Sequence, residues 1–191
     1  MKIENVNVYG LEDSVRAAKF PMSVDTDDLN ADITHGIMSL AQSGMGEGHD
    51  NWLLGVVVQY DVTASIKWWT EMERYHFADI VSSQSTTHRI SSFDLKTAYD
   101  KHTDPRMIAI MQDLQWEYHN RPCVETYLRM LYSNPCGMKL TARMTTNYRQ
   151  LKTIYKQRKT HKLYEWRVFC AWIETLPHSE FITGKALDDG E

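Results

Sequence analysis

Apolar side chains recur at two spacings along the chain, and these spacings predict a mixture of helices and strands. Residues 11–22 and 31–43 carry short helical patterns, and a glycine-rich break at 44–48 ends the second of them. Residues 52–62 (WLLGVVVQYDV) are rich in valine and aromatic side chains, which is typical of a strand. Residues 139–146 are expected to form a strand or an extended connection.

The remaining apolar periodicity is helical. Ser65 is an N-cap candidate for one helix, Asp104-Pro105 begins another, and the last helix stops before Pro177. The predicted helices cover residues 66–77, 105–120, 122–132 and 148–175. The stretch SSQSTTHRISS at 82–92 shows no periodicity, and the tail at 182–191 is expected to fray.

Composition narrows the class of protein. With 191 residues, 42% hydrophobic and 24% charged, the chain is expected to form one soluble domain, residues 1–191. The longest apolar run, 52–58, is far below the roughly 18 residues of a membrane span, and the N-terminus resembles no secretory signal. Three cysteines without C-x-x-C spacing favour reduced thiols. We therefore expect a cytoplasmic protein without membrane contact, in the host cytoplasm if it is viral.

The net charge of −4 hides a strong asymmetry. Residues 1–50 are mostly acidic among their charged positions, whereas residues 139–167 hold nine Lys and Arg against Glu165 alone. A basic segment in an acidic chain indicates an anionic ligand, and the alternative is a solvated helix face. Within the predicted helix 148–175, Arg158 and Glu165 fall in the apolar sector. They form a buried ion pair, extend to solvent at an oligomer interface, or form a site in which Arg158 meets a ligand. Lys152, Lys156, Lys159 and Arg167 are expected to be solvated.

A second candidate site lies between Arg74 and Arg89, where hydroxyl side chains, two histidines and two arginines gather. Phosphate groups require such donors and countercharges, although a surface loop without function has the same composition. The histidines and cysteines lack metal-ligand spacing, so no metal site is expected. P-loop, dinucleotide-binding and nucleophile-elbow motifs are absent.

Several separated segments together resemble the flavin-dependent thymidylate synthases. Ser14-Val15-Arg16-Ala17-Ala18-Lys19 is similar to the family's S-x-V-R-A-A-R, and Gly48-His49-Asp50 stands where the family has G-H-E/D. The C-terminal match is the most specific: Asn147-Tyr148-Arg149-Gln150-Leu151 followed by Arg158 fits N-x-R-x-L with a later Arg. Residues 161–167 (HKLYEWR) resemble H-A-Q-W-E-I-R. The resemblance covers about residues 10–177.

This resemblance implies an α+β fold with an antiparallel sheet packed against long helices, and a homotetramer whose active sites combine several subunits. The implied activity is methyl transfer to C5 of a pyrimidine deoxynucleotide, of the dUMP to dTMP type, with FAD, NADPH and methylenetetrahydrofolate. The implied flavin-binding residues are His49, Arg74, Tyr75, His76, Asn147, Arg149 and Thr153. The implied nucleotide-binding residues are Glu71, Ser85, Thr87, Arg89, Arg129 and Arg158, with Arg158 in the catalytic role.

The chain departs from the family at several of these positions. R-H-R has become Arg74-Tyr75-His76, Glu71 stands where the family has Gln, and Ser85 replaces the glutamate of N-E-x-S-x-R-Y. These changes concern pyrimidine recognition most. Three alternatives therefore stay open: a homologue that modifies dCMP or transfers a hydroxymethyl group, a non-catalytic nucleotide- or nucleic-acid-binding protein, and a structural oligomer. Nucleic acid is disfavoured as a partner because the chain is acidic.

Overall fold

A computed structural model describes residues 1–44 and 46–184 of the chain. The predicted tail positions 185–191 lie outside the described residues. Among the described residues, no helix is long and apolar enough to cross a membrane. The elements in chain order are β1 (Lys2–Tyr9), α1 (Leu11–Ala17), the 3-10 helix η1 (Phe20–Met22), α2 (His35–Ala41), the 3-10 helix η2 (Asn51–Gly55), β2 (Val57–Ser65), α3 (Ile66–Met72), β3 (Asp79–Ser83), α4 (Thr86–Arg89), the 3-10 helix η3 (Ile90–Ser92), α5 (Pro105–Asn120), α6 (Val124–Tyr132), β4 (Lys139–Asn147), α7 (Tyr148–Arg158), α8 (Tyr164–Ile173) and α9 (Glu180–Thr183).

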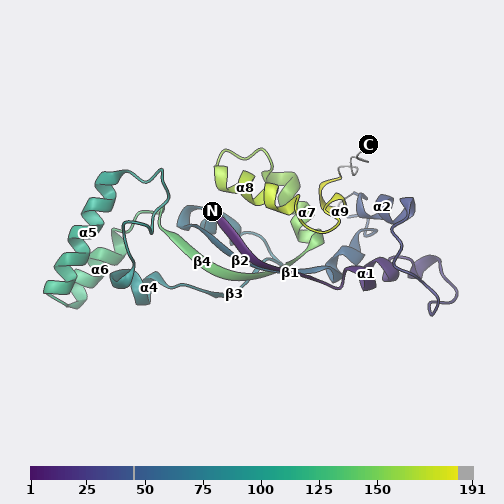
Figure 1. Ribbon diagram of the computed structural model, residues 1–191, viewed down its shortest axis with the longest axis horizontal. Coiled ribbons are helices and arrows are strands. Elements are labelled where there is room, and N and C mark those ends of the chain that lie inside the picture. The colour runs from purple at the N-terminus through teal and green to yellow at the C-terminus, as the bar shows by residue number, and fades with distance from the viewer. Residues whose placement is uncertain (45, 185–191) are drawn as a thin grey trace.

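The centre of the molecule is an antiparallel sheet with strand order β1-β2-β4-β3. Helices α7, α8 and α9 lie over one face of this sheet (Figure 1). Side chains of β2 alternate, so Val58, Tyr60 and Val62 are fully buried beneath those helices. The opposite face is polar and carries the Asp61–Arg143 ion pair. The predicted α+β class with an antiparallel sheet is confirmed.

A second, smaller core lies in the lobe formed by α5 and α6, which projects from one end of the sheet (Figure 1). Its buried members are Ile90, Leu95, Tyr99, Met111, Met130 and Met138. The main core joins the sheet to α3, α7, α8 and α9 through Trp68, Trp166 and Phe169. Helix α5 has the boundaries predicted from the sequence, because the Asp104 carboxylate caps it and Pro105 occupies its first turn.

The predicted strand at 52–62 is wrong at its beginning. Residues Asn51–Gly55 form a 3-10 helix, and the strand runs from Val57 to Ser65. Close packing of α1 explains this turn: a Cβ on Gly55 would lie 2.5 Å from Oγ of the buried Ser14, and one on Gly10 would lie 2.6 Å from the Gly55 carbonyl oxygen. Apolar composition alone did not distinguish this buried turn from a strand.

The predicted helix 148–175 is also wrong, because the chain turns back at residues 159–163 and forms two antiparallel helices, α7 and α8. Tyr155 contacts Glu174 and Arg158 contacts Trp166 across this pair. The turn contains neither Gly nor Pro, so the sequence has no local signal that a helix ends there. Packing of Trp166 and Phe169 onto the main core determines the break.

Smaller differences concern element ends. The predicted helices at 11–22, 31–43 and 66–77 shorten to α1, α2 and α3, and the stretch 82–92 contributes to β3, α4 and η3. The tail prediction from residue 182 is wrong at Ile182, which is buried within the main core. Strand β1 was not predicted, because its side chains are largely exposed and a register shift after Glu4 interrupts the alternation.

Gly137→Ala is expected to destabilise the chain by about 1–3 kcal/mol, because its Cβ would lie 2.1 Å from Oγ1 of Thr103. Gly36 provides the matched control. It lies in α2 with 3.6 Å to its nearest neighbour, so Gly36→Ala should stabilise by up to about 1 kcal/mol. Urea unfolding measures both. Equal changes in the free energy of unfolding for the two variants would contradict the close packing at Gly137.

Candidate functional site

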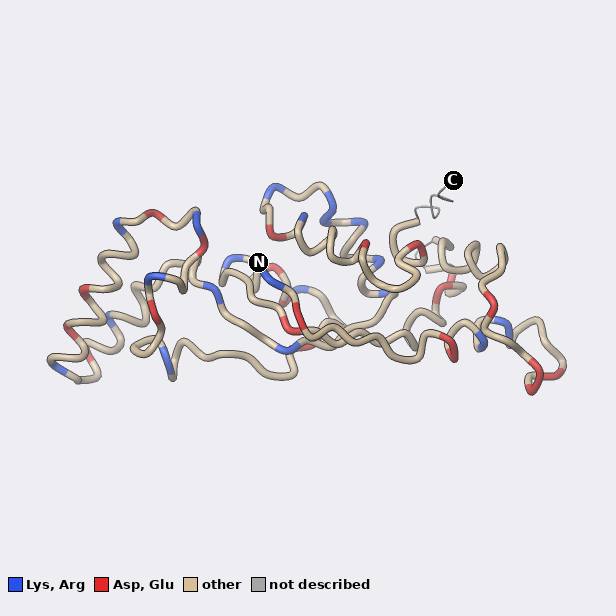
Figure 2. The backbone as a smooth tube through the Cα atoms, in the orientation of Figure 1, with Lys and Arg blue, Asp and Glu red and all other residues tan. Residues whose placement is uncertain are grey.

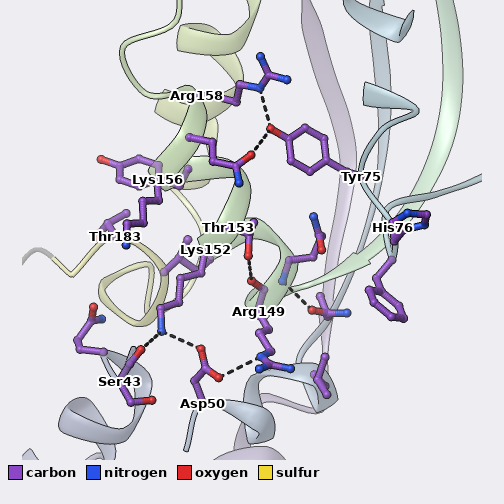
Figure 3. Close-up of a pocket in the computed structure, with 18 of the residues that line it drawn as sticks. Ser43, Asp50, Tyr75, His76, Arg149, Lys152, Thr153, Lys156, Arg158 and Thr183 are labelled. Atoms are coloured by element: carbon purple, nitrogen blue, oxygen red, sulfur yellow. Dashed lines mark hydrogen bonds and ion pairs between the residues drawn. The ribbon is translucent and has the colours of Figure 1, made fainter. Parts of the chain in front are cut away.

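The candidate site is a cavity of about 830 Å³ beside helix α7. Three other regions complete its walls: the segment after α2, the segment Arg74–Phe77 after α3, and the end of α9. Figure 3 shows side chains from these separate segments converging on the cavity. Its lining is dominated by polar and basic groups.

Asp50 anchors one end of the cavity. Its side chain is 3% exposed and accepts bonds from Nε of Arg149 at 3.0 Å and Nζ of Lys152 at 2.9 Å. Lys152 also donates to the carbonyl oxygens of Ala41 and Ser43, which lie at the end of α2. The expectation that Lys152 is solvated is therefore wrong. A buried carboxylate requires such partners, and here they join α7 to the segment after α2.

Arg158 occupies the other end, where aromatic rings surround it. Its guanidinium lies 4.6 Å from the ring centroid of Trp166 and 5.5 Å from that of Tyr75. Nε donates to the Tyr75 hydroxyl at 2.7 Å, and Nη1 donates to the Glu71 carboxylate at 3.2 Å. The Tyr75 hydroxyl in turn donates to Gln157 (Figure 3).

The ion pair that the sequence allowed between Arg158 and Glu165 does not form. Glu165 is buried and accepts hydrogen bonds from the backbone N–H and the hydroxyl of Ser65. Because the chain turns at 159–163, the two residues face different parts of the core. Arg158 is paired with Glu71 instead.

The cations of the cavity fall into two groups. Arg149, Lys152 and Arg158 have carboxylate partners. Within residues 1–44 and 46–184, Arg74, Lys156 and Lys159 form no ion pair although all three line the cavity. Lys159 lies over the Tyr155 ring. Figure 2 shows the blue Lys and Arg positions along α7 and the turn after it, away from the acidic loop between α1 and α2. Unpaired cations in a concave site favour an anionic ligand.

Most of the residues expected at a flavin site line this cavity. Those inside are Arg74, Tyr75, His76, Asn147, Arg149 and Thr153. His49 is exposed and lies outside the lining. Its neighbour Asp50, rather than His49, is the residue of that segment that reaches α7.

The residues expected at a nucleotide site do not converge within one chain. Glu71 contacts Arg158 directly. Ser85, Thr87 and Arg89 lie at or beside α4, and none of them lines the cavity. Arg129 lies on α6 and pairs with Glu117 and Glu125. These four residues belong to the end of the molecule that carries the second core (Figure 1).

Three features of the site were not predicted from the sequence: Lys156 and Gln157 as residues that line the cavity, and the structural role of Asp50. A signal for Lys156 was present, because Arg149, Lys152 and Lys156 follow the i, i+3, i+7 spacing of one helix face. Asp50 could not be assigned its partners, because Arg149 and Lys152 lie about a hundred residues away.

No protein-family model and no curated protein matches the amino-acid sequence. Solved structures do match. The flavin-dependent thymidylate synthase ThyX from Helicobacter pylori, solved with FAD and dUMP, is 16% identical, with 96% of this chain and 97% of that chain covered and a TM-score of 0.69. The UMP/dUMP methylase PolB from Streptomyces cacaoi, solved with 5-Br dUMP, is 14% identical with a TM-score of 0.63, covering 96% and 95%. The chain therefore has the fold of flavin-dependent thymidylate synthases, as its motifs indicated.

Proposed function

We propose that this chain is a flavin-dependent enzyme that transfers a one-carbon group to C5 of a pyrimidine deoxynucleotide, of the dUMP to dTMP type. FAD is the proposed cofactor, with methylenetetrahydrofolate as carbon donor and NADPH as reductant. The observation that carries the proposal is the cavity that combines unpaired cations with an arginine stacked on aromatic rings. Solved structures with the same fold support it, since the H. pylori enzyme was solved with FAD and dUMP.

The donor set of the cavity fits FAD. A pyrophosphate needs cationic donors, and Arg74 and Lys156 are free of carboxylates in the described part of the chain. The polar edge of a flavin ring needs hydrogen-bond donors. Asn147 can supply them, because its side-chain oxygen caps α7 and leaves the amide N–H groups available to donate. Asp50 is neutralised by Arg149 and Lys152, so it does not repel an anion.

When bound, FAD supplies hydride transfer, the redox chemistry that completes the methyl group. The residues of the chain bind and orient. Arg74 and Lys156 neutralise phosphate, and the polar groups that line the cavity orient the ligand. Arg158 can donate from Nη2 to a carbonyl oxygen of a pyrimidine, because Tyr75 and Glu71 accept hydrogen bonds from Nε and Nη1 and not from Nη2. Stabilising negative charge on that oxygen would favour reaction at C5.

We propose that the site is completed by other copies in a homotetramer. Ser85, Thr87, Arg89 and Arg129 lie outside the cavity of their own chain, yet they carry the hydroxyl and cationic groups that a nucleotide phosphate requires. Elements α4 and α6 of a neighbouring copy would bring such groups to the cavity. The proposal places the protein in the cytoplasm.

The flavin content of the purified full-length chain tests the proposal. The protein should bind FAD with a perturbed flavin absorbance spectrum and a higher melting temperature. Addition of dUMP should change that spectrum further. A response to dCMP instead would identify the substrate as a cytosine nucleotide. A chain that shows no spectral or thermal response to FAD would overturn the flavin function.

Arg158→Ala is expected to weaken dUMP binding by about 10- to 100-fold, because hydrogen bonds to a charged group contribute about 1.5–3 kcal/mol. The control is Arg121→Ala, which removes an exposed arginine at the end of α5, away from the cavity. Flavin-absorbance titration measures affinity, and circular dichroism checks the fold. Equal affinities for the two variants would contradict the placement of Arg158 in the nucleotide site.

A further inference from the structure

The carboxylate of Glu71 lies at the centre of a set of donors contributed by four parts of the chain. Oε2 accepts from Nε1 of Trp166 on α8 at 2.9 Å and from Nη1 of Arg158 on α7 at 3.2 Å. Oε1 lies 3.3 Å from Nζ of Lys67, one turn earlier on α3. Nε2 of His161, in the turn between α7 and α8, lies 3.7 Å from Oε2.

These contacts leave Glu71 little capacity to bind a ligand itself. Both oxygens already have cationic or N–H partners, and the side chain is 18% exposed. Although desolvation raises the pKa of Glu71, hydrogen bonds from Trp166 and Lys67 and the charges of Lys67 and His161 lower it by more. The group is therefore a carboxylate at neutral pH. Its direct effect is on Arg158.

Arg158 is fixed by this carboxylate in a defined orientation. The guanidinium lies against Trp166 and Tyr75, with Nε bound to the Tyr75 hydroxyl and Nη1 bound to Glu71. Nη2 donates no hydrogen bond within the described residues, and Arg158 lines the cavity. The guanidinium thus keeps free N–H donors, while the Glu71 carboxylate, which it shares with Lys67, offsets part of its positive charge.

We propose that Glu71 is a positioning residue that orients Arg158 and offsets part of its charge, so that this end of the cavity binds an uncharged polar group rather than a phosphate. This inference rests on the proposed function and refines it. It replaces the expectation that Glu71 binds the nucleotide directly. A pyrimidine nucleotide is then bound with its base, and not its phosphate, beside Arg158.

The decisive variant is Glu71→Gln, which removes the charge but retains an oxygen for Trp166. Two probes separate binding of a base from binding of a phosphate beside Arg158: deoxyuridine and inorganic phosphate, each titrated into the full-length flavin-loaded chain. Deoxyuridine affinity should fall by about tenfold, because Arg158 loses its fixed orientation. Phosphate affinity should rise severalfold, because Arg158 becomes an uncompensated cation. A purely structural effect would weaken both.

Glu73→Gln is the matched control, since Glu73 is exposed at the end of the same helix and the charge change is identical. It should leave the affinities within about twofold. A double-mutant cycle with Arg158→Gln tests whether Glu71 acts through Arg158. In the Arg158→Gln background, Glu71→Gln should change deoxyuridine affinity by less than twofold.

Two results would overturn the inference: the same affinities in Glu71→Gln and Glu73→Gln, or a full effect of Glu71→Gln without Arg158. If Glu71→Gln does not fold, Glu71→Asp carries the test, since it keeps the charge and shortens the reach. Deoxyuridine affinity should then fall with no gain for phosphate, and unchanged affinity for deoxyuridine would contradict the proposal. A wild-type chain that binds neither FAD nor nucleotide would instead reject the proposed function itself.

Discussion

Trp166→Ala is expected to lower the free energy of unfolding by about 3–5 kcal/mol, the range for truncating a large buried aromatic side chain. Trp166 is fully buried and packs against Trp68 and Phe169. It also supports Arg158 and donates a hydrogen bond to Glu71. Urea denaturation of the purified variant measures the loss. Ligand affinity should fall as well, because Arg158 loses its aromatic support.

Trp116→Ala is the matched control for this truncation. Trp116 is 69% exposed on α5, so the same change of side chain should cost about 0.5 kcal/mol or less. A similar loss of stability in both variants would show that Trp116 is buried in solution. A small loss at Trp166 would contradict its place in the main core.

Asp50→Asn is expected to destabilise the chain by about 2–3 kcal/mol. The substitution leaves Arg149 and Lys152 without their shared carboxylate in a partly buried setting, where breaking an ion pair is costly. Because the Arg149 side chain is 33% exposed, the expected loss lies at or below the lower end of the roughly 3–5 kcal/mol that is usual for breaking a buried ion pair. Thermal and urea unfolding at neutral pH measure the change.

Asp28→Asn tests whether the loss is specific to this anchor. Asp28 is exposed in the loop between α1 and α2, so its substitution should change stability by less than about 0.5 kcal/mol. If Asp50→Asn is as stable as Asp28→Asn, the Asp50 carboxylate does not join α7 to the segment after α2. Loss of stability in both would indicate an effect of net charge alone.

The sequence predicted the boundaries of those elements that begin and end at capping residues within their own segment. The proline and the aspartate cap at the start of α5 lie within its own segment, so its boundaries followed from the sequence. Strand β4 was similarly visible at 139–146. The turn at 159–163 was not, because the force that breaks the helix is burial of Trp166 against residues far away in the chain.

The same distinction applies to the candidate site. The motifs grouped Arg74, Asn147 and Arg149 at one site, and these residues line one cavity. The partners of Asp50 and Arg158 were not predictable. Each pairs with a side chain more than eighty residues away, and the sequence instead allowed a pair between Arg158 and Glu165 that the turn prevents.

The turn at 159–163 also makes the cavity sensitive to chain length. A continuous helix would carry each further turn 5.4 Å along its axis, so residue 166 would lie about 12 Å beyond residue 158. The reversal instead returns Trp166 to the guanidinium eight positions before it. An insertion or deletion of one residue in this short turn would displace α8 relative to its contacts. Among homologues, the length of this turn should therefore vary less than the length of an exposed loop such as that between α1 and α2.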